Sequence, residues 1–576
     1  MNLSFSQLLW QTTESESKPQ QIANLCREMK ISPTFAKILI NRNLCEPETI
    51  HQYLNPARQQ CHDPFLMHDM NKAVQRVYSA LKRREKVVIY GDYDVDGTAG
   101  TVILYRYLKR IGLRIYYFIP LRLKNGYGMT ESTLLELHHK KTDLIITIDN
   151  GITAIAESRL LHRLGVDLII TDHHQTCSEQ PIAEAILNPQ KPECPYPFEG
   201  LSGTGVAFKF LEAFDQFLTE QGYWDLSGYI RPDLQRDLDL VAFATIADRV
   251  PLIDENRYFV REGLEMINSN PRPGLQALIK ESNIRGYITP NIISFKLAPK
   301  INAVGRLSDP NLGVHLLLSH SQSEARQHAV KLIQINTERQ QIEYHVLKSA
   351  LSLADRQQDQ DMIILVNESW HSGVIGSVAA KIAARFQKPT VIVTLFEDQL
   401  AIGSIRSVGN FDICSALQDC NELLDKFGGH KAAAGISLQT KHIEVFCKQF
   451  RQTIPSGFAK AMDHEALKIE AWVGLQDLKD GLVHELLQMS PFGSHNPEPI
   501  LGIKKTRLKD ITVFGNQHLK FCVNTAEMDM EVFAWDHSDW QTKLEGLLDL
   551  AIILQMHHVS HNAPLQFKAI DIKPTS

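Results

Sequence analysis

Three aspartates stand within five residues in VVIYGDYDVDGTAGTVIL, at positions 87–104, directly after an apolar run. They are Asp92, Asp94 and Asp96. Later apolar runs also end in carboxylate or imidazole groups, namely Asp149, Asp172, His173, His174 and Asp248. Like charges held close together raise one another's pKa and destabilise a fold unless cations lie between them. Carboxylate oxygens with one imidazole suit Mn²⁺ or Mg²⁺, and two such ions about 3.5–4 Å apart support phosphoester hydrolysis.

Two simpler explanations of the first aspartate group compete with a two-metal site. The pattern D-x-D-x-D-G also opens a calcium-binding EF-hand loop, but that loop follows a helix and needs Glu at its twelfth position, where Ile103 stands. A solvated acidic turn accounts for Asp92–Asp96 taken alone. It accounts less well for the later runs that end in the same way, and for two adjacent histidines that would point to opposite faces of a strand.

The elements that must position these groups are predicted from the pattern of residues 86–250. The short apolar runs KVVIY, IYYFI, DLIITI and DLIIT alternate with longer amphipathic stretches. Continuous apolar runs are typical of parallel strands covered by helices on both faces. We therefore expect a doubly wound parallel sheet, in which the carboxyl ends of the strands converge on one edge. Each acidic group, including Asp248, is expected at a strand end, so that at least four carboxylates share one cleft.

The rest of the chain shows four other patterns. Residues 1–85 have a mostly helical pattern. Between Gly313 and Gly373, a stretch without glycine or proline predicts one long helix, solvated in its middle, that joins two domains, and two helices with a polar turn at 336–341 are the alternative. Strand-like runs then restart and end in KFGGHKAAAG. From about residue 460, short strands separated by turns predict a small β-barrel.

Composition limits the class of partner and the compartment. The chain has 576 residues and a formal net charge of -6, so any nucleic-acid-binding surface must be local. The nine cysteines are scattered without a C-x-x-C pair, so neither a zinc site nor a disulfide framework is indicated. This usage fits a reducing cytoplasm. The sequence opens without a charged segment leading into an apolar one, and no stretch of about 18 apolar residues occurs, so we expect a cytoplasmic protein without a membrane span.

Four motifs resemble, in order, those of the DHH phosphoesterase superfamily: GDYDVDG, TIDNG, TDHHQ and ATIADRVPL. Further stretches are similar to the RecJ family of single-stranded-DNA-specific exonucleases, among them LAPKINAVGRLSDP, WHSGVIGSVAAKIA, GSIRSVGNFD, FGGHKAAAG and SPFGSHNPEP. The resemblance covers residues from about 40 to 570 and implies an α/β fold of several domains. The expected ranges are an N-terminal helical segment at 1–60, a DHH domain at 61–315, a linking helix at 316–358, a smaller α/β DHH-associated domain at 359–458 and an OB-fold β-barrel at 459–576.

The resemblance also implies an activity and residue roles. The family hydrolyses single-stranded DNA from the 5′ end and releases 5′-mononucleotides with two Mn²⁺ or Mg²⁺ ions. Asp94 resembles a ligand of one metal, Asp96 a ligand of the other, and Asp149 the carboxylate that bridges them. The other matches are His173 and Asp248 as further ligands of the second metal, Asp92 and Asp172 as residues that orient ligands, and His174 as a contact to the scissile phosphate or its leaving oxygen. Tyr90 stands where pyrophosphatase-type relatives have a ligating histidine, so one metal has fewer protein ligands.

By the same resemblance, a pocket for the terminal 5′-phosphate is formed by Arg122, Arg306, Ser404 and Arg406, with His430 nearby. A terminal phosphate bears more charge than an internal phosphodiester, and arginine binds it bidentately. Each arginine alone is an ordinary surface residue, and Arg306 could pair with Asp309 instead. Ile405 departs from the small residue that the family often has there. Gly428 and Gly429 could allow a close backbone approach, or their segment could begin a helix packed on a sheet.

The last expectations concern the DNA path, the partners and the alternatives. Aromatic stacking holds single-stranded bases without reading sequence, and the candidates in the predicted barrel are Phe492, His518, Lys520 and Trp535. The resemblance implies a monomeric enzyme of DNA recombination and repair that acts on single-stranded DNA, with a single-strand-binding protein and a RecQ-type helicase as expected partners. Two other functions stay open. One is a phosphodiesterase of short oligonucleotides or cyclic dinucleotides, and the other is a non-catalytic scaffold.

Overall fold

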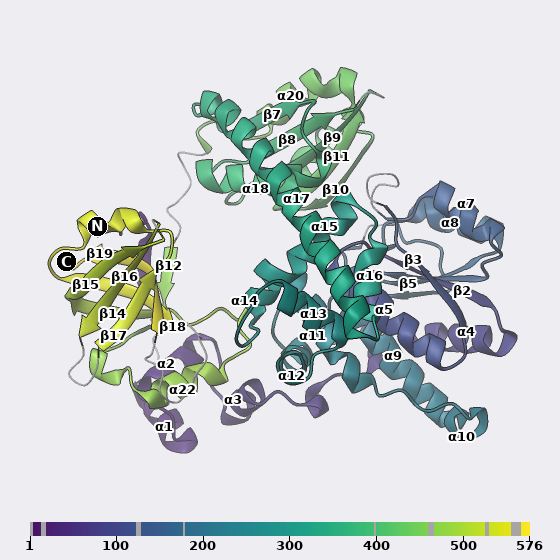
Figure 1. The fold of residues 1–576 in the computed structure, drawn as a ribbon, viewed down its shortest axis with the longest axis horizontal. Coiled ribbons are helices and arrows are strands. Elements are labelled where there is room, and N and C mark those ends of the chain that lie inside the picture. Colours follow the sequence, from purple (N-terminus) through teal and green to yellow (C-terminus); the bar gives the residue numbers. More distant parts are fainter. Residues whose placement is uncertain are drawn as a thin grey trace.

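The computed structural model describes every residue except 1–3, 13–18, 122–127, 177–178, 397–398, 459–465, 516, 525–528, 555–565 and 576. Three units that contain sheets surround a layer of helices (Figure 1). In this view the parallel sheet lies on the right, a mixed sheet lies at the top, and the C-terminal strands lie on the left. Of the helices in the described ranges, none is long and apolar enough to cross a bilayer.

The first unit is built around a five-stranded parallel sheet. Its elements are α4 (Met70–Arg83), β2 (Lys86–Gly91), α5 (Val95–Arg110), β3 (Arg114–Phe118), α7 (Glu131–His139), β4 (Leu144–Ile148), α8 (Ile155–Leu164), β5 (Asp167–Thr171), β6 (Ala185–Leu187) and α9 (Gly203–Glu220). The strand order is β3-β2-β4-β5-β6, and every pair is parallel. α5 and α9 cover one face and α7 and α8 the other, which explains why β4 is buried along its whole length. The doubly wound sheet predicted from the sequence is confirmed.

A layer of helices follows this sheet. Its elements are α10 (Tyr223–Ser227), α11 (Leu238–Ala247), α12 (Glu255–Ser269), α13 (Pro273–Glu281), α14 (Pro290–Ile292), a π-helical turn (Ile293–Leu297), α15 (Ala298–Leu307), α16 (Asn311–Leu318) and α17 (Gln322–Ala354). The long helix predicted from the sequence is confirmed as one continuous helix, because α17 runs unbroken through the polar block at 336–341. It packs on α13 and α15 near its start and on α18 (Ser372–Phe386) near its end.

The strand predicted before Asp248 is wrong, because that segment forms α11. All but the last of its residues are buried, and all of them except Asp239 and Thr245 are apolar, so the segment is covered on every side. A short, uniformly apolar run gives the same sequence pattern in a buried strand and in a buried helix, and periodicity cannot separate the two.

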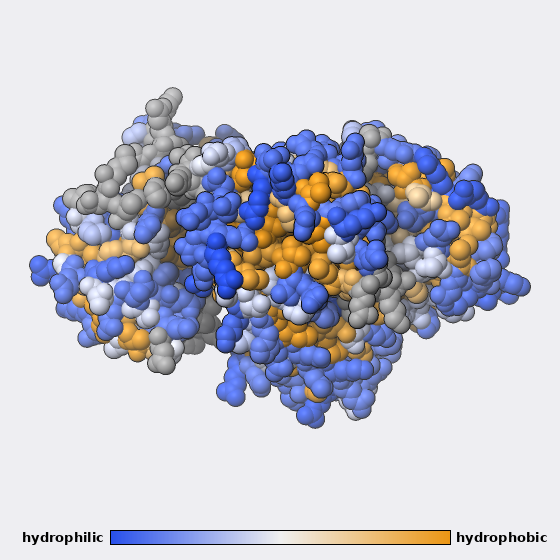
Figure 2. Space-filling view, turned by 90° about the horizontal axis from the view of Figure 1, so that it is seen from above, coloured by the Kyte–Doolittle hydropathy of each residue, from blue (hydrophilic) through white to orange (hydrophobic). Residues whose placement is uncertain are grey.

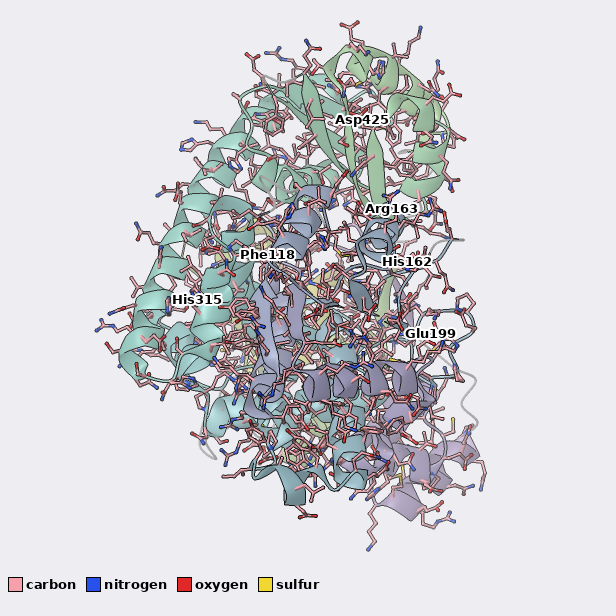
Figure 3. All side chains as sticks on the ribbon, turned by 90° about the vertical axis from the view of Figure 1, so that its right-hand side faces the viewer. Phe118, His162, Arg163, Glu199, His315 and Asp425 are labelled. Carbon is pink, nitrogen blue, oxygen red and sulfur yellow. The ribbon has the colours of Figure 1, made fainter. Side chains whose placement is uncertain are left out.

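The second sheet has five strands in the order β10-β11-β9-β8-β7. The remaining elements of this unit are β7 (Ile363–Asn367), β8 (Thr390–Leu395), β9 (Leu400–Arg406), α19 (Ile413–Gln418), β10 (Lys426–His430), β11 (Ala433–Gln439) and α20 (Ile443–Gln452). FGGHKAAAG is therefore a β-hairpin, and the alternative that it begins a helix is wrong. Figure 3 shows this sheet above the parallel sheet, with α17 running along both. Phe118, at the carboxyl end of β3, lies at the edge of the parallel sheet that faces the upper sheet (Figure 3).

The C-terminal strands form a seven-stranded sheet that shares a core with the start of the chain. The elements are β1 (Leu9–Thr12), α1 (Pro19–Met29), α2 (Pro33–Asn41), α3 (Pro47–Leu54), β12 (Ala466–Ile469), β13 (Ala471–Trp472), α22 (Asp480–Gln488), β14 (Leu501–Thr506), β15 (Leu508–Phe514), β16 (His518–Asn524), β17 (Asp529–Ala534), β18 (Leu548–Leu554) and β19 (Gln566–Pro574). β1 pairs with β12, and the backbone N–H of Phe5 donates to the carbonyl of Ile572 at 2.8 Å. Side chains of α2 and α3 lie in the same hydrophobic cluster as the barrel strands. Viewed from above, hydrophilic residues cover most of the molecule and hydrophobic ones gather in the middle (Figure 2).

Candidate metal centre

The motif GDYDVDG forms the turn from β2 into α5. Asp94 is the N-cap of α5, and its Oδ1 accepts hydrogen bonds from the backbone N–H groups of Asp96 (3.0 Å) and Gly97 (3.1 Å). A Cβ atom on Gly97 would lie 2.5 Å from the backbone nitrogen of Asp92, so only glycine lets the first turn of α5 approach the end of β2 this closely. The turn therefore places three carboxylates at the carboxyl edge of the sheet.

The start of α9 holds the carboxylate of Asp96. The backbone N–H of Gly203 donates to Oδ2 at 2.6 Å, and that of Thr204 donates to Oδ1 at 2.8 Å. A helix N-terminus favours negative charge because its first N–H groups lack partners within the helix. A Cβ on Gly203 would lie 2.7 Å from Cβ of Asp149, so this glycine also lets α9 approach the end of β4. Gly203 and Thr204 were not among the residues predicted for the site; the signal for them is the Ser-Gly-Thr-Gly run at 202–205 before an apolar helix.

Asp149 lies at the end of β4 in a left-handed backbone conformation, with φ of 63°. Its backbone N–H donates to the carbonyl of Thr171 on the neighbouring β5 at 2.9 Å. Such conformations are uncommon outside glycine, asparagine and aspartate, and they cluster at functional sites. The unusual turn directs the Asp149 carboxylate toward the histidines that follow β5.

Asp172 fixes both histidines. Its Oδ1 accepts from the backbone N–H groups of His173 (2.8 Å) and His174 (3.1 Å) and contacts Nδ1 of His174 at 2.7 Å. Its Oδ2 accepts from the backbone N–H of Ile152 at 2.9 Å. Burial acts to raise the pKa of Asp172, but the hydrogen bond and charge of His174 outweigh it and lower the pKa overall. Burial acts to lower the pKa of His174, and the Asp172 carboxylate reverses this and raises it to about 9.

The two imidazole rings do not point to opposite faces of a strand. Both residues follow β5 rather than belong to it, and their ring centroids are 4.6 Å apart. The expectation from strand alternation is therefore wrong for His173 and His174, although both lie in the cleft. Alternation applies only inside an extended strand.

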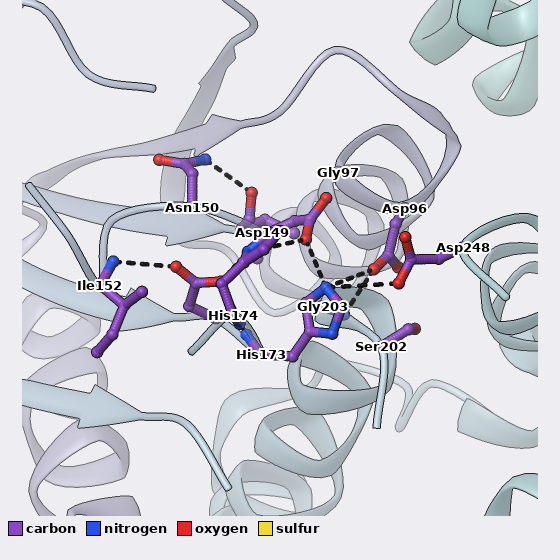
Figure 4. A network of polar contacts seen from close by, with 12 residues as sticks. Asp96, Gly97, Asp149, Asn150, Ile152, His173, His174, Ser202, Gly203 and Asp248 are labelled. Atoms are coloured by element: carbon purple, nitrogen blue, oxygen red, sulfur yellow. Dashed lines mark hydrogen bonds and ion pairs between the residues drawn. The ribbon is translucent and has the colours of Figure 1, made fainter. Parts of the chain in front are cut away.

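His173 is the meeting point of the cluster (Figure 4). Its Nε2 lies 3.1 Å from Oδ1 of Asp149, 3.5 Å from Oδ2 of Asp248 and 3.7 Å from Oδ2 of Asp96. Asp248 reaches this point from the C-cap position of α11, so a helix end takes the place of the expected strand end. The structure brings together the sequence-predicted group of Asp92, Asp94, Asp96, Asp149, Asp172, His173, His174 and Asp248.

Burial and mutual repulsion raise the pKa of three of these carboxylates. For Asp94, burial is the largest cause and the charge of Asp96 is the next, partly offset by the N–H of Gly97. The pKa values of Asp149 and Asp248 lie well above the ordinary value, through burial first and then through the charges of Asp96 and Asp94. Positive charge in the cleft would remove this repulsion.

The donor atoms fit divalent cations. Three sets of ligand atoms each lie within 4.8 Å of one another: Asp149, His173 and His174; Asp96, His173 and Asp248; Asp92, Asp94 and Asp149. Within the described part of the chain, Oδ1 of Asp149 and Nε2 of His173 are buried and make no hydrogen bond, although they are 3.1 Å apart. Buried polar atoms rarely go without a partner, so these atoms point to a missing ligand. Carboxylate oxygens with one imidazole are the donors that Mn²⁺ and Mg²⁺ take.

A second group of predicted residues lies between α15, α18 and β9. Nη1 of Arg306, near the end of α15, donates to the carbonyl of Gly373 at the start of α18 (3.3 Å). A Cβ on Gly376 would lie 3.2 Å from both Oγ of Ser404 and Nη2 of Arg406, so these β9 side chains face the first turns of α18. His430 is exposed at the same end of the sheet, two strands away from Arg406. Arg122 lies outside the described residues.

Helix α15 connects this second group to the carboxylates. Oδ1 of Asn302 accepts from the backbone N–H of Val95, the residue between Asp94 and Asp96, at 2.9 Å. A Cβ on Gly305 would lie 2.1 Å from the ring of Tyr93, so α15 packs directly on the aspartate turn. Asn302 and Gly305 are two residues whose part sequence reasoning missed, although both stand in the quoted stretch LAPKINAVGR.

Three of the four barrel candidates share one face. His518 and Lys520 are two residues apart on β16, so they point to the same face. The ring of Trp535 lies 5.0 Å from that of His518. Lys520 forms an ion pair with Glu531 at 2.5 Å. Phe492 lies apart from them, packed against the barrel core.

Comparison with known proteins gives the family. A model described as "DHH family, N-terminal domain" matches residues 86–243, a "DHHA1 domain" model matches 359–456, and a "RecJ OB domain" model matches 469–571. The chain is 32% identical over 548 residues to single-stranded-DNA-specific exonuclease RecJ of Bacillus subtilis (strain 168), covering 94% of this chain and 67% of that one. It is 31% identical over 521 residues to the RecJ of Escherichia coli (strain K12), covering 88% and 90%. The chain belongs to the RecJ family.

RecJ structures have the same overall architecture. The crystal structure of Thermus thermophilus RecJ in complex with Mn²⁺ superimposes with a TM-score of 0.81 and 26% identity, over 99% of this chain and 79% of that one. The complex of the same protein with Mg²⁺ gives a TM-score of 0.75 at 24% identity, which shows the fold. The family, its fold, and Mn²⁺ or Mg²⁺ as the ions that its members hold agree with what the sequence predicted.

Proposed function

We propose that this chain is a single-stranded-DNA exonuclease that hydrolyses phosphodiester bonds with two Mn²⁺ or Mg²⁺ ions. The supporting observation is the convergence of carboxylates from α5, the end of β4 and the end of α11 on His173, at the carboxyl edge of a parallel sheet. The other support is membership of a family whose relatives are named single-stranded-DNA-specific exonucleases. A scaffold that had lost its ligands would not keep this set.

The chain's own residues would hold the ions and orient the ligands that bind them. Asp94, Asp96 and Asp149 would hold the ions together with two further residues, His173 and Asp248. The N–H groups at the start of α9 fix the direction of the Asp96 carboxylate, and Asp172 holds the imidazole of His174 and the backbone of His173. When bound, the two ions would supply the positive charge that activates water and stabilises the leaving oxygen. His174, held by Asp172, would face the scissile phosphate.

The polarity of digestion would come from the second group of residues. Arg306, Ser404 and Arg406 surround the first turns of α18, and a helix N-terminus with arginines is a suitable site for a terminal phosphate. Four residues of α15, or about 6 Å along the helix axis, separate Asn302 at the aspartate turn from Arg306. A 5′-phosphate bound there would leave the next phosphodiester at the carboxylates, so the product would be a 5′-mononucleotide.

The deciding experiment uses a single strand labelled at its 3′ end, incubated with Mn²⁺ or Mg²⁺. The wild-type chain is expected to shorten the strand progressively from its unlabelled 5′ end. Asp149→Asn is the matched inactive variant, because asparagine tolerates the left-handed backbone at this position and removes only the charge. Strand binding without shortening by the wild type would favour a scaffold, and cleavage of dinucleotides alone would favour a small-substrate phosphodiesterase.

The phosphate pocket has its own test in the same assay. Arg406→Ala is expected to raise KM for a 5′-phosphorylated strand about tenfold or more, because a charged hydrogen-bonding partner of the phosphate is lost. The variant should change KM little for a 5′-hydroxyl strand. Arg385→Ala, exposed at the other end of α18, is the control. Equal loss on both strands would contradict the pocket.

The partners and setting complete the proposal. A single-strand-binding protein and a RecQ-type helicase would supply the substrate in recombination and repair, and the chain would act as a cytoplasmic monomer. The support for these points is the family resemblance and the cysteine usage of the sequence. Size-exclusion chromatography with light scattering tests the monomer, and a dimer mass would overturn it.

A further inference from the structure

An exposed aromatic ring lies beside the carboxylate cluster. Phe295 is 65% exposed and belongs to the π-helical turn between α14 and α15. The guanidinium carbon of Arg249 lies 5.3 Å from the centre of this ring. Arg249 directly follows Asp248, so the ring and its cation stand at the rim of the cleft that holds the Asp248 carboxylate.

The position of this ring is fixed by the backbone around it. The hydroxyl of Ser294 donates to the carbonyl of Ile246 at 3.2 Å, which ties the π-helical turn to the last turn of α11. Arg249 has a left-handed backbone with φ of 59°, an uncommon conformation for arginine. Single π-helical turns inside helices occur often at functional sites, and they cost helix stability. The chain therefore keeps an unfavourable local geometry that presents Phe295 to solvent.

Three cations lie on or beside the π-helical turn that carries the ring. Lys296 follows Phe295, and Nζ of Lys300 donates to the carbonyl of Lys296. Burial and the charge of Lys296 lower the pKa of Lys300. Among the residues that the structure describes, Arg249, Lys296 and Lys300 form no ion pair. A protein with a net charge of -6 has enough carboxylates to pair them, so their grouping here favours an anionic ligand.

A single exposed phenylalanine is ordinary on a protein surface. Tyr344 on α17, for example, is 63% exposed. Phe295 differs because a cation, Arg249, stands beside its ring and directly follows Asp248, a carboxylate of the cleft. Arg306 and Phe295 lie toward opposite ends of α15, so a strand whose 5′ end reached Arg306 would extend past the carboxylates toward Phe295.

We propose that Phe295, with Arg249, Lys296 and Lys300, is a binding subsite for a base of the single strand on the 3′ side of the scissile bond. The ring would stack on the base, and the three cations would face the adjoining phosphates. This inference rests on the proposed function, since it assumes that a single strand enters from the Arg306 side. Stacking on an aromatic ring tolerates any base, which suits an enzyme that digests without regard to sequence.

The first test measures binding of a 5′-phosphorylated, 3′-labelled single strand by fluorescence anisotropy in EDTA. Phe295→Ala is expected to weaken binding about fivefold or more, the low end for loss of one stacked base. Phe295→Trp should restore it. Tyr344→Ala is the control, and its affinity should match the wild type. Equal affinity of Phe295→Ala and the wild type, or an equal loss in Tyr344→Ala, would overturn the subsite.

The second test asks which base the ring contacts. A series of strands, each with one abasic position near the 5′ end, is bound to the wild type and to Phe295→Ala. One abasic position should weaken wild-type binding as much as the substitution does, and it should cause no further loss in Phe295→Ala. Additive losses at every position would overturn the subsite. A wild-type chain that digests the strand while these expectations fail would leave the proposed function intact, whereas a chain that neither binds nor digests would reject both.

Discussion

At the scale of single residues, the site depends on a carboxylate that need not touch a metal. Asp172 accepts three hydrogen bonds from the histidine pair and one from Ile152, so its two oxygens fix the ring of His174 and the backbone of both histidines. Substituting a residue that orients a metal ligand in this way typically costs about 10- to 100-fold in metal affinity or activity.

We expect Asp172→Asn to weaken Mn²⁺ binding roughly 10- to 100-fold, because an amide cannot accept from His174 and the backbone with the same charge. The measurement is a calorimetric Mn²⁺ titration, supported by the Mn²⁺ dependence of the digestion rate. The control is Asp167→Asn, at the other end of the same strand, where the carboxylate pairs with Arg76 at 2.6 Å. If excess Mn²⁺ fails to restore activity while affinity is unchanged, Asp172 acts in some other way.

The sequence predicted best those site residues that stand close together in the chain. The apolar run before Asp92 predicted a strand with Asp92, Asp94 and Asp96 at its end, and β2 followed by the first turn of α5 confirms this. The contribution of Gly203 was missed, because its backbone N–H group reaches Asp96 from a helix more than a hundred residues away. Backbone donors leave no mark of their own in a sequence.

At the scale of elements, α17 shows what periodicity alone does not predict. Its middle is solvated as the sequence predicted, since Thr337, Glu338 and Gln340 are exposed, yet Glu343, just past the polar block, is only 5% exposed. Its carboxylate pairs with Arg339 on the same helix and with Lys381 on α18 at 2.5 Å. A buried charged residue beside a polar block cannot be distinguished from a solvated one in the sequence, because its partner on α18 is distant in the chain.

Glu343 makes a pH-dependent contribution to stability. Burial acts to raise its pKa, but the bonds from Lys381 and Arg339 outweigh burial and hold the pKa below the ordinary value of about 4.5. A carboxylate with a lowered pKa stabilises the fold above its unfolded pKa, and this contribution is lost as the pH falls through the folded pKa.

We therefore expect Glu343→Gln to lower the free energy of unfolding by about 1 kcal/mol at pH 7, a modest value because the Lys381 side chain is 56% exposed. The difference from the wild type should shrink below about pH 4. Thermal melts from pH 3 to pH 7 measure this, with the exposed Glu338→Gln on the same helix as the control. A difference that is constant over the pH range would contradict the ion-pair explanation.

Strands predicted from short apolar runs were confirmed in the parallel sheet but not before Asp248. The four runs KVVIY, IYYFI, DLIITI and DLIIT became β2 to β5 because short apolar runs bounded by turns fit a sheet covered on both faces. The run before Asp248 had the same composition and became α11, whose burial is decided by the helices around it. Likewise β1 exists only because β12, far along the chain, offers an edge to pair with.

At the scale of the whole molecule, Arg257 joins two units. One is the barrel unit, formed by α1–α3 and the C-terminal sheet, and the other is the catalytic unit, formed by the parallel sheet and the helices that follow it. Arg257 lies on α12 and is 3% exposed, and its guanidinium donates to the carbonyls of Tyr53 (3.1 and 2.9 Å), Met489 (3.2 Å) and Ser490 (3.2 Å). Burial lowers the pKa of Arg257 to about 10, so it stays charged at neutral pH. Nearby, the backbone N–H of Leu252 donates to the carbonyl of Ser494 at 2.9 Å.

The contact between the two units lies close in the chain to the metal-binding carboxylates. Leu252 is four residues after Asp248. A short segment therefore runs from a carboxylate of the cleft to a contact with the barrel unit. A strand that runs from the cleft to the barrel would need the two units in a fixed relation. A single buried side chain that bonds carbonyls from two distant segments is suited to hold that relation, because each carbonyl left without a donor costs about 1–3 kcal/mol.

We expect Arg257→Met to loosen the two units without unfolding either. The radius of gyration from small-angle X-ray scattering should increase, and KM for a long single strand should rise several-fold while that for a strand of a few nucleotides changes little. Arg261→Met, one turn along α12, is the control, because Arg261 is exposed and donates to a single carbonyl, that of Leu54 at 2.9 Å. An unchanged scattering curve with equal losses on long and short strands would mean that Arg257 serves only the stability of the catalytic unit. A length-dependent loss would mean that the barrel takes part in digestion through its position, because no residue of the barrel would have been altered.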